Sequence, residues 1–198
     1  MSKAIATYVR YVEAVNYRIG RAAMYLLFAM MGILLWSSIS KTFFVPALWT
    51  LEMAQFAMVA FYMLGGPYSI QLGSNVRMDL FYSTWSPRRK AWTDAFTVLF
   101  LIFYLAVLLW GALSSTAYSL GYFSTDTFGF YATLIGDLVT GGPDAAAANF
   151  GHIERSATAW RPFMWPVKLI MCIGIFLMLL QAVSELFKSI LVIREDGV

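Results

Sequence analysis

Four long apolar runs constrain the fold of this sequence more than any other feature. They cover about residues 22–41, 48–72, 91–117 and 164–187. Each run is about 20 residues or longer, so a helix that rises about 1.5 Å per residue can cross a hydrocarbon core of about 30 Å. Strands of a membrane barrel would be only about ten residues long and would alternate in polarity, which these runs do not. The sequence therefore predicts an all-α membrane protein with four transmembrane helices.

The composition supports a chain that lies in the bilayer. Charged residues make up only 13% of the chain, whereas a soluble domain carries about 25%. The 198 residues suffice for a single membrane domain, residues 1–198, without a sizeable soluble domain. The cations flank the apolar runs, so we expect the lipid bilayer to be their partner and expect no nucleic-acid binding.

The first 21 residues have a helical pattern of their own. Apolar and aromatic residues recur at helical spacing from Ile5 to Ile19, and they are interspersed with the cations Lys3, Arg10, Arg18 and Arg21. This pattern is typical of an amphipathic helix that lies on the membrane surface, or of the cytoplasmic start of the first span.

The distribution of charge predicts the orientation. The connection between the second and third runs is dense in cations, namely Arg77, Arg88, Arg89 and Lys90. The long connection over residues 118–162 is acidic instead, with Asp126, Asp137, Asp144 and Glu154. The positive-inside rule then places both termini and the 73–90 connection in the cytoplasm, and the 118–162 loop in the periplasm. A loop of this length suggests a docking or lid segment, although a flexible insertion explains it equally well.

Charges inside the apolar runs are costly and therefore informative. Glu52 lies near the outer end of the second run, Lys168 near the outer end of the fourth, and Lys41 closes the first run on the same side. We expect Glu52 to pair with Lys168 or Lys41. The alternative is that each side chain reaches the membrane interface separately.

A second polar set lies at the inner end of the predicted spans. Gln181 and Glu185 are four residues apart, so they share one face of the last helix. Arg77 and Asp79 follow the second run at a similar depth. Such a cluster would join helices within the chain or contact another subunit.

Residues suited to catalysis or to holding a cofactor are few. His152 is the only histidine and Cys172 the only cysteine, so the chain lacks paired histidines for haem and a cysteine-based metal site. There is also no glycine-rich phosphate loop. We therefore expect no cofactor, no bound metal and no enzyme activity, which favours a partner subunit over a complete machine.

Two stretches carry a family resemblance. The end of the second run reads MLGGPYSIQLGSNVRMDLFY and is followed by SPRRKAW, and the last run reads WPVKLIMCIGIFLMLLQAVSELFKSI. Both resemble the small membrane subunit of tripartite ATP-independent periplasmic (TRAP) transporters, the DctQ-type family. The matching positions are Gly73, Val76, Arg77, Asp79, Ser86, Pro87, Arg88, Arg89, Trp165, Pro166, Lys168, Gly174, Gln181 and Glu185. Glu52 matches an early acid of the second span, and Asn75 stands where the family usually has His.

The resemblance implies a role in sodium-coupled uptake of organic acids across the bacterial inner membrane. In such systems a periplasmic substrate-binding protein delivers the substrate, a large membrane subunit carries the substrate and ion sites, and the small subunit braces the scaffold of the large one. The residues for which it implies subunit-interface or structural roles are Glu52, Arg77, Asp79, Lys168, Gln181 and Glu185. Two other interpretations stay open, which are the membrane anchor subunit of a respiratory enzyme and a small four-span exporter.

Replacement of Arg77 with Ala should weaken assembly with the large subunit more than it alters the choice of substrate. The reason is that the resemblance gives this cation a structural role and leaves the substrate site to another chain. The yield of the purified complex, compared with the range of substrates transported, tests this expectation. A normal yield of complex together with lost transport would count against it.

Overall fold

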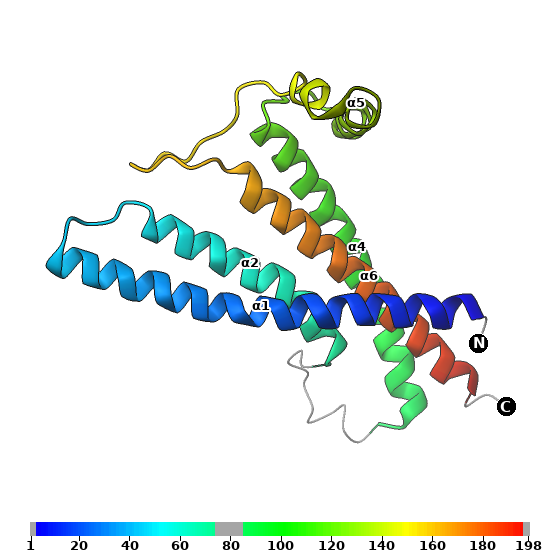
Figure 1. The fold of residues 1–198 in the computed structure, drawn as a ribbon. Coiled ribbons are helices and arrows are strands. Elements are labelled where there is room, and N and C mark those ends of the chain that lie inside the picture. Colours follow the sequence, from blue (N-terminus) through cyan, green and yellow to red (C-terminus); the bar gives the residue numbers. More distant parts are fainter. Residues whose placement is uncertain (1–2, 74–84, 196–198) are drawn as a thin grey trace.

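The computed structural model describes residues 3–73 and 85–195, and this part of the chain is helical (Figure 1). Its helices are α1 (Lys3–Phe43), α2 (Thr50–Gln71), α4 (Pro87–Ser119), α5 (Thr127–Ala147) and α6 (Trp165–Glu195). Within these described ranges, β-structure is limited to an isolated antiparallel bridge between Arg155 and Phe163. The predicted all-α fold is therefore confirmed for this part of the chain.

Four of the helices follow one another in space in the order α1, α2, α6, α4. Helix α1 packs along α2, α2 along α6, and α6 along α4. The α1–α2 pair and the α4–α6 pair cross part of the way along the helices and diverge toward the turn between α1 and α2, so that this side of the ribbon has the shape of a V (Figure 1). Helix α6 is central, since 44% of its most apolar stretch is buried, against 11% for α1 and for α4.

Three helices of the described part are long and apolar enough to cross a membrane: Lys3–Phe43, Arg89–Ser119 and Trp165–Ile193. They correspond to the first, third and fourth predicted spans. Helix α2 coincides with the second predicted span, but it is not among these three candidate spans of the described residues. The four-span topology thus stays a prediction.

Helix α1 runs without a break from Lys3 to Phe43. The boundary expected between residues 21 and 22 is therefore absent, and of the two interpretations of the first 21 residues the structure shows a continuous first helix. At about 1.5 Å per residue, its 41 residues extend for about 60 Å, which is about twice the thickness of a hydrocarbon core. Part of α1 must consequently lie outside the core.

Glycines allow α2 and α6 to approach each other closely. A Cβ atom at Gly174 would lie 2.5 Å from the backbone oxygen of Met63, and one at Gly66 would lie 2.8 Å from the sulfur of Met178. Small residues at helix contacts permit the close van der Waals packing on which association in lipid depends. Beside this contact, α4 and α6 enclose an apolar core of Leu105, Ala112, Cys172, Ile175 and Ala182.

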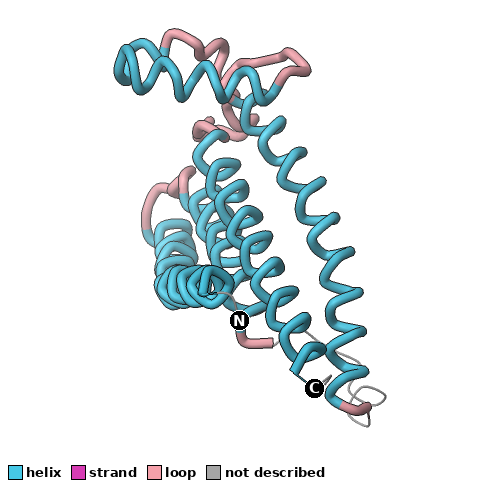
Figure 2. Tube along the Cα trace, turned by 90° about the vertical axis from the view of Figure 1, so that its right-hand side faces the viewer, coloured by secondary structure: helices cyan, strands magenta, loops and turns pink. Residues whose placement is uncertain are grey.

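The predicted loop over residues 118–162 contains helix α5, which Figure 2 shows lying across the end of α4. The Tyr131 hydroxyl donates a hydrogen bond of 3.0 Å to the Leu113 carbonyl of α4. Burial raises the pKa of the Tyr131 phenol to about 12, so it remains a donor at neutral pH. The structure therefore shows a helix over residues 127–147 in place of an irregular loop, while both interpretations of this connection, a docking or lid segment and a flexible insertion, stay predictions.

Residues 149–164, called the strap below, lead the chain from α5 to α6. The Glu154 backbone N–H donates to the Ser119 carbonyl at 2.9 Å, which ties the strap to the end of α4. Farther along, the Ser156 N–H donates to the Pro162 carbonyl at 2.9 Å and closes a hairpin. This hairpin reaches across the open end of the V toward α2 (Figure 1).

Replacement of Gly174 with Ala is expected to destabilise the chain by about 1–3 kcal/mol, because the new methyl group would overlap the backbone of Met63 and push α2 away from α6. Gly111→Ala is the matched control on α4, where nothing lies within 4 Å of the added Cβ. Thermal unfolding of the purified chain in detergent compares the two variants. Equal unfolding midpoints would contradict the close helix contact described above.

Candidate functional site

The first candidate site is a polar cluster at the open end of the V, where the strap meets α2 and α6. Lys168 Nζ donates to Glu154 Oε2 at 2.6 Å and to the Ser115 carbonyl of α4 at 3.2 Å. The Ser156 hydroxyl donates to Glu52 Oε1 at 3.0 Å. The predicted pairing of Glu52 with Lys168 is therefore wrong, because the strap supplies a separate partner to each of them.

Glu52 is buried, with only 4% of its surface exposed. Its second carboxylate oxygen, Oε2, has no hydrogen-bond partner among the described residues. Lys41, the other predicted partner, is exposed in the last turn of α1, and no ion pair joins it to Glu52. A buried carboxylate that loses a donor is costly, so the bond from Ser156 ties the strap firmly to α2.

The second candidate site is a chain of polar contacts between α1 and α6. The Asn16 amide donates to Gln181 Oε1 at 2.8 Å, and Gln181 Nε2 donates to Glu185 Oε1 at 2.9 Å. Lys188 donates to the same Glu185 oxygen at 2.8 Å and also pairs with Glu13 of α1. Asn16 and Gln181 are almost fully buried. The predicted polar cluster is thus confirmed for Gln181 and Glu185.

Sequence reasoning missed Asn16, Glu13 and Lys188 as members of this second site. A signal was present, since Glu13 and Asn16 lie three residues apart and so share one face of a helix. Lys188 lies one turn beyond the predicted pair on α6. Arg77 and Asp79 fall outside the described residues, so their part in the cluster stays a prediction.

A third polar contact joins α1 to α2 near the turn between them. The Thr50 hydroxyl donates to the Ser37 hydroxyl at 3.1 Å, and the nearby Ser40 hydroxyl donates to the Ser37 carbonyl at the same distance. All three residues are buried. Hydroxyl groups of this kind commonly hold helices together in lipid.

These three sites are suited to fixing helices in place. Most of their polar groups bond to one another or to the backbone, and they link α1 to α2, α1 to α6, and α2 through the strap to α6. Within residues 3–73 and 85–195, no three His, Cys, Asp or Glu side chains are grouped so that they could hold a metal ion. The described contacts therefore join helices to one another and to the strap.

Replacement of Asn16 with Leu is expected to destabilise the chain by about 1–3 kcal/mol, because the buried Gln181 oxygen loses its donor. Gln181→Leu should have a similar effect, since it leaves the buried Asn16 amide without its acceptor. The double variant should lose clearly less free energy of unfolding than the two single variants together, because neither the Asn16 amide nor the Gln181 oxygen is then left without its partner. A double-mutant cycle by thermal unfolding measures this coupling, and strictly additive effects would refute it.

Comparison with known proteins connects this arrangement to a family. A family model for the DctQ component of tripartite ATP-independent periplasmic transporters matches residues 30–191. No curated protein and no solved structure gave a significant match. The matched range includes most of the helices described above, and it confirms the resemblance in the sequence. The chain therefore belongs to the DctQ family, the small membrane component of TRAP transporters.

Proposed function

We propose that this chain is the small integral-membrane subunit of a sodium-coupled TRAP transporter for organic acids, and that it braces the scaffold of the large transport subunit. The observation that carries the proposal is the open arrangement of its helices. Helices α1 and α4 bury only 11% of their most apolar stretches. A set of helices this open offers apolar surface to lipid and also to a larger membrane protein.

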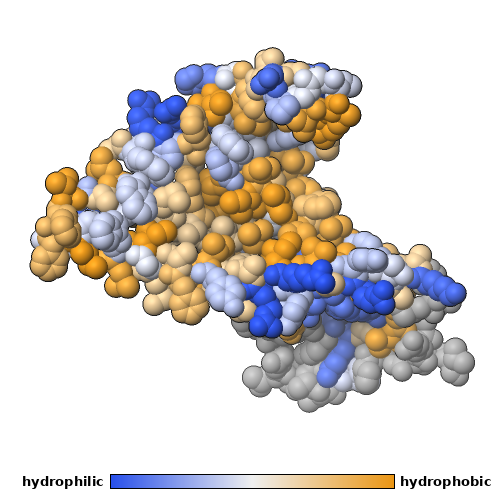
Figure 3. Space-filling view, viewed as in Figure 1, coloured by the Kyte–Doolittle hydropathy of each residue, from blue (hydrophilic) through white to orange (hydrophobic). Residues whose placement is uncertain are grey.

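The exposed apolar surface is extensive on the outer helices. On α4 the exposed fractions are 63% for Phe96, 61% for Phe100 and 70% for Phe103. On α1, Tyr25 and Phe28 are exposed to a similar degree. In the face seen in Figure 3, hydrophobic residues cover the middle of the molecule between more hydrophilic regions at the top and at the lower right. Apolar patches of this extent mark contact with lipid or with a protein partner.

A bracing role agrees with the polar contacts at both ends of the V. The bond from Ser156 to Glu52 spans the open end, and the bond from Asn16 to Gln181 joins α1 to α6 near the crossing. Together they resist a change in the angle between the two helix pairs. A component that holds its shape is suited to support another subunit that moves.

The same proposal includes a location and an orientation. The two termini lie near each other at one end of the molecule (Figure 1), and the N-terminal part of α1 is hydrophilic in Figure 3. We assign this end to the cytoplasm, with α2 as a fourth span of the bacterial inner membrane. Helix α5 and the strap then face the periplasm, where a periplasmic substrate-binding protein could contact them.

The two other interpretations of the sequence receive less support. The DctQ family is a family of transporter components and not of enzymes, which disfavours a respiratory anchor. A tripartite system also divides its work among several parts, which disfavours an exporter that acts alone.

Co-purification tests the proposed function. The tagged chain is co-expressed with the large membrane subunit of the same transporter. The product is purified in mild detergent and analysed by mass spectrometry. We expect a stoichiometric, many-span membrane protein. After reconstitution into liposomes, we expect organic-acid uptake only with a sodium gradient and the binding protein. Lys41→Gln serves as a control, because this exposed cation is outside the three polar sites.

Several results would overturn the proposal. A chain that stays stable and binds no second membrane protein would exclude a subunit role. A partner that carries haem or flavin would indicate a respiratory anchor. Drug resistance conferred by the chain alone would indicate an exporter.

A further inference from the structure

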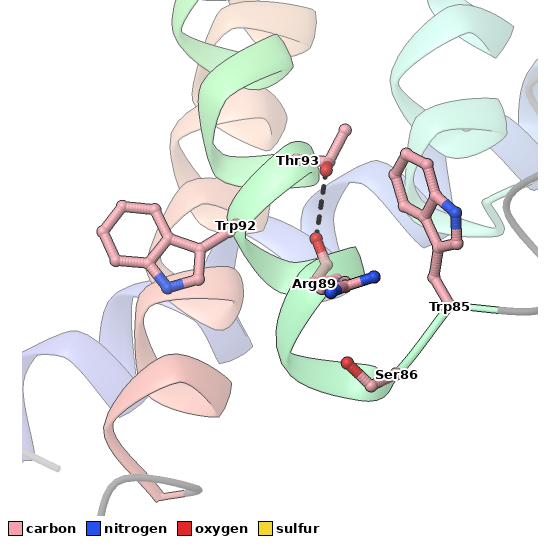
Figure 4. A pocket seen from close by; sticks show the side chains of 5 residues that line it. All are labelled: Trp85, Ser86, Arg89, Trp92 and Thr93. Atoms are coloured by element: carbon pink, nitrogen blue, oxygen red, sulfur yellow. Dashed lines mark hydrogen bonds between the residues drawn. The ribbon is translucent and has the colours of Figure 1, made fainter.

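A pocket at the start of α4 lies outside the sites described so far. It has a volume of about 690 Å³ and is lined by Trp85, Ser86, Arg89, Trp92 and Thr93. Figure 4 shows Arg89 between the two indole rings, with the Ser86 side chain below it. The Thr93 hydroxyl is engaged, because it donates to the Arg89 carbonyl at 3.0 Å. The pocket therefore presents a cation beside the Trp85 ring, with the Trp92 ring on the other side and pointing away from the cation.

Arg89 is available for a ligand. Its side chain is exposed, and no carboxylate of the described residues lies within ion-pair distance of it. A guanidinium group presents a planar set of N–H donors that matches the oxygens of a phosphate. The positive charge of the pocket is therefore complementary to a phosphate group. No acidic side chain of the described residues occupies that place.

An apolar stripe continues from the pocket along α4. Trp92 lies three residues after Arg89, and Phe96, Leu99 and Phe103 follow at helical spacing on the same face. The four side chains are exposed by 59%, 63%, 53% and 70%, respectively. Hydrocarbon chains could therefore lie along the helix directly above a group that is bound at Arg89.

The position of the pocket agrees with the depth of lipid headgroups. The pocket lies at the first two turns of α4, at the N-terminal end of the most apolar candidate span of the described residues. Tryptophan rings favour this interfacial depth. Basic pockets at the cytoplasmic end of membrane helices bind anionic headgroups, and the charge distribution assigns this end to the cytoplasm.

We infer that the pocket and the stripe together form a binding site for one anionic phospholipid. Arg89 holds the phosphate, Trp92 and Trp85 flank the headgroup, and the acyl chains follow Phe96, Leu99 and Phe103. A ligand with both a phosphate and long apolar chains fits this combined site better than free phosphate, which would leave the stripe unused. The site rests on the proposed orientation of the chain in the membrane, but it does not require the proposed transport role.

Native mass spectrometry of the full chain tests this inference, both alone and in complex with the large subunit. The probes are dioleoyl phosphatidylglycerol and dioleoylglycerol, which differ only in the headgroup. We expect one phosphatidylglycerol molecule to be retained per chain and dioleoylglycerol to be lost. Arg89→Gln should weaken retention by about tenfold, the loss of one charged hydrogen-bonded contact. Arg18→Gln, which removes another exposed cation, on α1, should leave retention unchanged.

Four outcomes would overturn the inference. Equal retention by Arg89→Gln and Arg18→Gln would show that the pocket is not the site. Equal retention of dioleoylglycerol would show that the phosphate is not recognised. Displacement of the phospholipid by an equal concentration of inorganic phosphate would show that the stripe contributes nothing. Loss of the lipid on assembly with the large subunit would show that the pocket is a protein contact.

Discussion

The contact between α2 and α6 is the one on which the rest of the structure depends. It is where the α1–α2 pair meets the α4–α6 pair, and Gly174 and Gly66 bring the two helices together there. Lipid tails are as apolar as the side chains, so burial from water does not drive helices together within a membrane. The closeness of this contact therefore provides the dispersion energy that holds the two pairs in one molecule.

A single close contact fixes the distance between α2 and α6, but it does not fix the angle between the two helix pairs. Polar contacts away from the crossing determine that angle, with Glu52 bound by the strap on one side and Asn16 bound to Gln181 on the other. Each buries polar groups that are costly to leave unpaired. The shape of the V is therefore set by a few hydrogen bonds, while its cohesion comes from apolar packing.

The helices of this fold could be predicted from sequence more readily than its contacts. Long apolar runs determine helices locally, and the spacing of Gln181 and Glu185 indicates a shared face. The partner of Lys168 could not be predicted, because pairing with Glu154 depends on how the strap folds back. Helix α5 was not predicted, although the Asp126 side chain accepts from the Gly129 N–H as a helix cap does. The reason is the Gly141-Gly142-Pro143 sequence, which is typical of a turn and at which the helix is kinked.

The bond between Ser156 and Glu52 also has a consequence for biogenesis. The two residues are 104 positions apart in the chain. At a synthesis rate of about 5–20 residues per second, Ser156 is made about 5–20 seconds after Glu52. During that interval the first helical hairpin carries an acid whose later donor does not yet exist. Until the strap is made, the Glu52 carboxylate must therefore be in contact with water or with another protein.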